Sequence, residues 1–184
     1  MGNAILSRMN LKERFEQSDT CRFYLCLYQM TEFSEYIFLT QGLGAARFQP
    51  AAEQLGVNRV NPLYAHFLSF CNGGELFTTS VLGVNRTSDS DIVRYNRLAT
   101  TRLNLPRSHY IIAYENYGAQ VCLAKDGTDH RVFLWDVAHQ RLECHWSDLA
   151  DWLSEEIDNG RRLIEDGLLS PIAGTELEDD LKLQ

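Results

Sequence analysis

Apolar residues recur at helical spacing in the segment that follows Asn61-Pro62. An asparagine followed by proline is a favoured start for a helix, because the asparagine side chain caps free backbone N–H groups and proline has none to satisfy. The pattern predicts a helix from residue 62 to residue 71. Asn72-Gly73-Gly74 is expected to end it, because glycine readily adopts the left-handed conformation of a C-terminal cap. The predicted apolar face consists of Leu63, Tyr64, Phe67, Leu68 and Cys71.

The second half of the chain contains short apolar segments separated by turn signals. Residues 110–114, 120–124, 131–137 and 141–146 are predicted strands, since each is short, apolar or alternating, and bounded by polar residues. Asp126-Gly127 is a strong turn signal between two of them. Consecutive strands joined by short turns predict an antiparallel meander.

An amphipathic segment follows the last predicted strand. Ser147 is the predicted N-cap of a closing helix. The buried stripe of this helix is expected to consist of Leu149, Trp152, Leu153, Ile157 and Ile164. The segment after it is acidic and contains Pro171 and Gly174, so residues 166–184 are predicted to form a flexible tail.

The first half of the chain gives weaker signals. Helices are predicted over residues 10–16, 34–40 and 51–55, the last of which ends at Gly56. The apolar run 23–28 fits a buried strand or part of a helix, because periodicity does not separate the two in a short segment. A strand is predicted over 75–82, and residues 92–98 fit a short helix.

Helices first, then a sheet, then a closing helix is an order that indicates an α+β fold. We predict a mainly helical N-terminal extension over residues 1–48 and one α+β domain over residues 49–165, followed by the tail. With 184 residues, of which 45% are hydrophobic and 23% charged, the composition is that of a globular protein with a sizeable core.

The net charge of −8 lies in the last third of the chain. Lys and Arg against Asp and Glu number 6 and 6 over residues 1–60, 6 and 6 over 61–130, and 5 and 13 over 131–184. An acidic surface repels nucleic acid and membrane phosphates and attracts a basic partner. We therefore expect a protein partner, and neither nucleic acid nor a membrane; acidic charge that only maintains solubility is the simpler explanation.

Few residues suggest chemistry. The chain has no pattern typical of a signal peptide and no apolar run long enough to span a bilayer, which predicts a cytoplasmic protein with reduced cysteines. Cys21 and Cys26 are spaced too widely for a typical zinc site. Cys71 at a helix end is a candidate nucleophile, but the negative end of a helix dipole raises the pKa of a thiol. We expect no metal, no cofactor and no catalysis.

An ordered set of motif residues resembles the SUKH superfamily of bacterial immunity proteins and a yeast cell-wall assembly regulator. The set consists of Glu53, Gly56, Pro62, Tyr64, Phe67, Leu68, Asn72, Gly73 and Gly74. The resemblance continues through Leu105-Pro106, the strand 132–136 and the closing helix. It implies a single domain with a curved, mainly antiparallel sheet and helices packed on one face.

The resemblance also implies a binding protein. The first hypothesis is an immunity protein that binds a cognate toxin, for example a basic nuclease domain, and blocks it without chemistry. A regulatory or scaffolding protein is the second hypothesis, and a small Cys/His hydrolase is the third. The expected partner-binding residues are Tyr114, Glu115, Asn116 and Tyr117 in one turn, and Asp151, Glu155 and Asp158 on one face of the closing helix. The partner and the oligomeric state are open.

Overall fold

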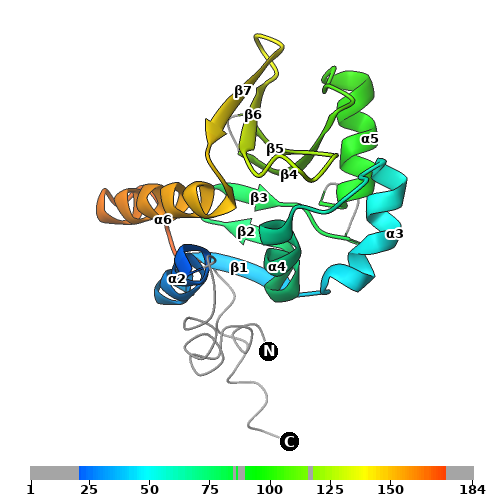
Figure 1. The fold of residues 1–184 in the computed structure, drawn as a ribbon. Coiled ribbons are helices and arrows are strands. Elements are labelled where there is room, and N and C mark those ends of the chain that lie inside the picture. Colours follow the sequence, from blue (N-terminus) through cyan, green and yellow to red (C-terminus); the bar gives the residue numbers. More distant parts are fainter. Residues whose placement is uncertain (1–20, 85, 87–89, 116–117, 173–184) are drawn as a thin grey trace, which may run out of the picture.

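The computed structural model describes residues 21–84, 86, 90–115 and 118–172 (Figure 1). In this part of the chain, one open antiparallel sheet has the strand order β1 to β7, so every strand pairs with its sequence neighbours. The α+β class and the single sheet are confirmed. The elements are α2 (Cys21–Met30), the 3₁₀ helix η2 (Thr31–Phe33), β1 (Ile37–Gln41), α3 (Ala45–Leu55), α4 (Pro62–Phe70), β2 (Cys71–Leu76), β3 (Thr79–Val81), α5 (Ile92–Arg102), β4 (His109–Glu115), β5 (Gln120–Ala124), β6 (Val132–Asp136), β7 (Arg141–Trp146) and α6 (Leu149–Glu165).

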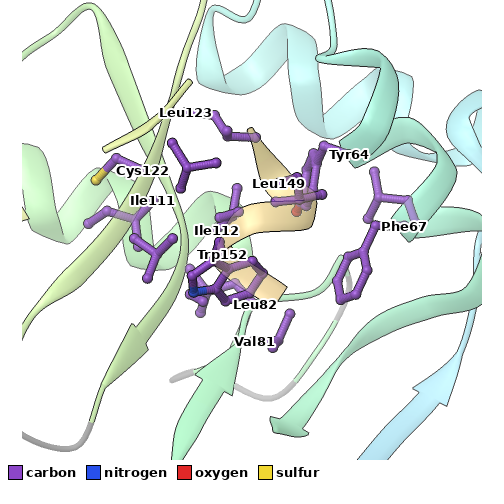
Figure 2. Packing of buried hydrophobic residues seen from close by; sticks show 14 of the residues in the cluster. Tyr64, Phe67, Val81, Leu82, Ile111, Ile112, Cys122, Leu123, Leu149 and Trp152 are labelled. Carbon is purple, nitrogen blue, oxygen red and sulfur yellow. The ribbon is translucent and has the colours of Figure 1, made fainter. Parts of the chain in front are cut away.

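The core lies where α4 and α6 meet the middle of the sheet (Figure 2). Trp152 of α6 and Tyr64 of α4 are both fully buried, as are Ile111 and Leu123 of the central strands. All five residues of β5 are buried, so this strand is covered on both of its faces. Burial of large apolar side chains supplies the main driving force for this arrangement.

Local signals place the start of α4 correctly and the N-cap of α6 within one residue. The Asn61 side chain accepts hydrogen bonds from the backbone N–H groups of Leu63 (3.0 Å) and Tyr64 (3.2 Å), which confirms the predicted cap of α4. The cap of α6 is Asp148, which accepts from Ala150 and Asp151, so the prediction of Ser147 was wrong. Serine and aspartate cap helices equally well, and the sequence contains them side by side.

Asn72-Gly73-Gly74 does not cap a helix, because β2 begins at Cys71 directly after α4. Instead, the two glycines allow neighbouring backbone segments to come close to β2. A Cβ on Gly73 would lie 2.8 Å from the amide nitrogen of Gly83, and a Cβ on Gly74 would overlap the carbonyl oxygen of Phe38 in β1. Both residues also have positive φ angles, 84° and 140°. Their role is therefore to let β1 and the segment after β3 pack against β2.

Two other predictions fail, one because the partner strand is distant in sequence and one because a tight turn interrupts the predicted strand. Residues 34–40 were predicted to be helical, but Ile37–Gln41 form β1 and pair with β2, where Phe38 lies opposite Glu75. The predicted strand 75–82 is divided between β2 and β3, and Phe77 adopts a φ of 55° in the turn between them.

Other predicted elements have the expected type of secondary structure but different limits. The run 23–28 belongs to α2. The helix that ends at Leu55 begins at Ala45, six residues before the predicted start, and the helix predicted over 92–98 continues to Arg102 as α5. The predicted helix 10–16 and the tail from residue 173 lie outside the described residues.

The described residues before residue 49 contribute to the same core as the later elements. Phe23, Tyr24, Leu27 and Met30 of α2 are each at most 4% exposed. Because α2 packs against α6 and β1 extends the sheet, residues 21–41 are integral to the packed structure. The exact division into extension, domain and tail stays a prediction.

Candidate functional site

The end of β7 and the outer face of α6 form a shallow, open depression of about 420 Å³. The two elements are joined by only Ser147 and Asp148, so the last residues of the strand lie beside the first two turns of the helix. The depression is lined by His145, Trp146, Ser147, Asp151, Ser154, Glu155, Asp158 and Arg162. It therefore includes the three helix residues expected to contact a partner.

Each of the three carboxylates has a different environment. Glu155 is exposed and accepts a 2.7 Å hydrogen bond from the indole N–H of Trp146, which fixes its position over the depression. Asp158 is exposed and forms a 3.1 Å ion pair with Arg161 one turn later. Both remain open to solvent on the depression side, so a basic group can approach them.

Asp151 has a structural role. Arg22 of α2 reaches Asp148 and Asp151 with its two terminal nitrogens, each at 2.5 Å. The Arg22 side chain is about half exposed, and an ion pair of this kind contributes up to ~1 kcal/mol. This contact attaches α2 to the start of α6.

The turn predicted to bind a partner is only partly described. Tyr114 is half-buried and stacks on Tyr95 of α5, with ring centroids 4.9 Å apart and planes inclined by 3°. Asn116 and Tyr117 lie outside the described residues. Glu115 is half-buried at the end of β4, where burial, followed by the charge of Glu155, raises the pKa of its carboxyl, while His145 lowers it. Glu115 thus shares an electrostatic environment with the acidic face of α6.

Glu156 is a residue that the sequence interpretation missed. Glu156 is only 6% exposed, and its carboxylate accepts a 2.9 Å hydrogen bond from the Thr79 hydroxyl. Burial, then the nearby Glu115 and Glu155 charges, raise its pKa to about 7. The signal was present: Glu156 falls four residues after Trp152 and one before Ile157, inside the apolar stripe.

The groups that could support chemistry are dispersed. Among the described residues, no cluster of three or more His, Cys, Asp or Glu side chains could hold a metal ion. Cys71 is fully buried, and burial raises the pKa of its thiol to about 12. A protonated, inaccessible thiol is a poor nucleophile.

Comparison with known proteins decides the family. The family model with the description SUKH_5: SMI1-KNR4 cell-wall matches residues 42–158, well over half of the 184-residue chain. The chain belongs to the SUKH family. No curated protein matches it significantly. None of the described helices is long and apolar enough to cross a membrane.

Most of the SUKH motif residues have structural roles in this chain. Tyr64, Phe67 and Leu68 are buried on α4, Pro62 is its first residue, and Gly56 ends α3 in the left-handed conformation. The Asn72 side chain bonds both backbone groups of Val84, accepting at 2.8 Å and donating at 3.0 Å. Glu53 is exposed on α3. The acidic face of α6 also lies within the matched segment, which ends at Asp158.

Proposed function

We propose that this SUKH-family protein binds a basic surface of a protein partner through the depression between β7 and α6, without chemistry. The observation that carries the proposal is the gathering of Asp151, Glu155 and Asp158 around one depression, against a single lining arginine, Arg162. A concentration of like charge at an open site raises the association rate of an oppositely charged partner and favours it over acidic competitors.

The partner that fits best is a toxin domain with a basic, nucleic-acid-binding cleft. An acidic protein that occupies such a cleft imitates the phosphate charges of the natural ligand. The electrostatic contribution to binding is sensitive to salt, because exposed charges are screened over ~10 Å at 0.1 M ionic strength. In this role the protein acts as an immunity protein.

The test is an affinity pull-down of the tagged full chain from its native host, followed by quantitative binding to the retained protein. Asp158→Lys and Glu155→Lys are each expected to weaken binding at least tenfold, mainly through the association rate. Glu53→Lys is the matched control, because it makes the same charge change at an exposed helical position on α3. Equal losses in the control and the site variants would refute the proposed location.

One observation supports the second function. The description of the matching family model names a cell-wall protein, which agrees with a regulatory or scaffolding role. The same pull-down separates the two: one stoichiometric basic partner supports toxin neutralisation, whereas several retained partners support a scaffold.

A further inference from the structure

Glu156 is an acidic residue on the buried side of α6. It lies between Leu153 and Ile157, which are at most 1% exposed. A carboxylate in such a place loses most of its hydration, and this loss is costly unless a cation or several hydrogen bonds replace the water.

Among the described residues, no cation is paired with Glu156 to replace that hydration. The Thr79 hydroxyl donates to Glu156 at 2.9 Å, and none of the ion pairs found in the described residues includes Glu156. The arginines on α6 and on the elements packed against it have other partners. Arg22 of α2 binds Asp148 and Asp151, and Arg141 of β7 pairs with Glu143. On α6, Arg161 lies over Phe33 and pairs with Asp158, and Arg162 donates to Asn159.

The ionisable groups whose charges change the pKa of Glu156 are both acidic. The negative charges of Glu115 and Glu155 both raise the pKa of the Glu156 carboxyl. Glu115 belongs to β4, and its backbone pairs with Thr79 in the sheet. His145 of β7 lowers the pKa of the Glu115 carboxyl. Against these charges, the Thr79 hydroxyl and the Trp152 side chain lower the pKa of Glu156, but burial outweighs both.

We propose that a proton on Glu156 holds α6 against β3, and that loss of this proton is a switch that loosens the helix beside the docking depression. In the protonated state the carboxyl is neutral and remains an acceptor for Thr79. After ionisation, a buried charge that has no cation partner among the described residues faces Glu115 and Glu155, and the Thr79 hydrogen bond offsets only part of its lost hydration. The pKa of Glu156 is raised to about 7, first by burial, so the change falls in the neutral range.

The direction of the pH effect follows from linkage. A glutamate in the unfolded chain titrates near ~4.3, whereas folded Glu156 retains its proton up to about pH 7. Between these values unfolding releases a proton, so the stabilising contribution is fully present below ~4.3 and is lost as pH rises toward 7. The inference concerns the fold alone and stands independently of the proposed partner.

The first measurement is a carbon-13 NMR titration of the glutamate carboxyl groups in the full-length protein. The Glu156 signal is expected to titrate near pH 7. A midpoint at an ordinary glutamate value of ~4.3 would overturn the proposal without the need for any variant.

The second measurement compares the unfolding equilibrium constants of the wild type and Glu156→Gln between pH 5 and pH 8. Glutamine keeps the shape and the acceptor for Thr79 but has no charge. The ratio of the two constants is expected to change by about 80-fold over this range, with the folded state of the variant favoured relative to that of the wild type at high pH. Glu155→Gln, on the exposed face, is the matched control and is expected to leave most of the pH dependence in place. A ratio for Glu156→Gln that does not vary with pH would refute the switch.

Discussion

Gly74→Ala tests why the Asn72-Gly73-Gly74 motif is present. Gly74 has a φ of 140° and lies opposite Leu39 in the β1–β2 pair. A Cβ at this position would overlap the Phe38 carbonyl oxygen and lie 2.9 Å from the Cα of Leu39. Both neighbours are backbone atoms, so no side-chain rotation relieves the overlap, and β1 must move away from β2.

The expected cost has two parts. Holding a residue other than glycine at this φ costs about 1–3 kcal/mol, and displacing well-packed neighbours costs about another 1–3 kcal/mol. Gly74→Ala is therefore expected to lower the free energy of unfolding by about 4 kcal/mol. Chemical denaturation followed by circular dichroism measures this difference.

Gly56→Ala is the matched control. Gly56 also has a positive φ, 69°, but a Cβ there meets nothing within 4 Å. Its substitution retains only the backbone cost, about 1 kcal/mol. If Gly74→Ala lost no more stability than Gly56→Ala, close approach between β1 and β2 would not be the reason for the glycine at this position.

Three further predictions concern other parts of the fold. Asn96→Leu removes hydrogen bonds to both the N–H (2.7 Å) and the C=O (2.8 Å) of Ile111 and is expected to destabilise the protein by ~3 kcal/mol in urea unfolding; a loss below ~1 kcal/mol would contradict this role. Arg22→Met is expected to cost up to ~1 kcal/mol at low salt and less in 1 M NaCl, and equal losses at both would exclude an ionic origin. Mass spectrometry of the native protein at pH 8 is expected to show alkylation of the exposed Cys144 long before the buried Cys71; rapid reaction of Cys71 would revive the hydrolase hypothesis.

The sequence by itself determined the elements whose partners are near in the chain. Strands β5 and β7 have the predicted limits, 120–124 and 141–146, because antiparallel neighbours joined by short turns are specified by local alternation and turn residues. The start of α4 was also readable, since Asn61 bonds N–H groups only two and three residues away. The positions of Asp151, Glu155 and Asp158 along one depression follow from helical spacing, although a partner contact at these residues stays a prediction.

The tertiary structure decided what depends on distant partners. Strand β1 exists because β2, more than thirty residues later, offers it a hydrogen-bonded edge. From the sequence, Gly73 and Gly74 are expected to end a helix. In the structure they allow the close approach of Gly83 and β1. From the sequence, Glu156 resembles its solvated neighbour Glu155. In the folded protein it lies on the buried side of α6 and accepts a hydrogen bond from Thr79. In each case the local pattern permits two conformations or environments, and packing against a remote segment selects one because it buries apolar surface and satisfies the backbone.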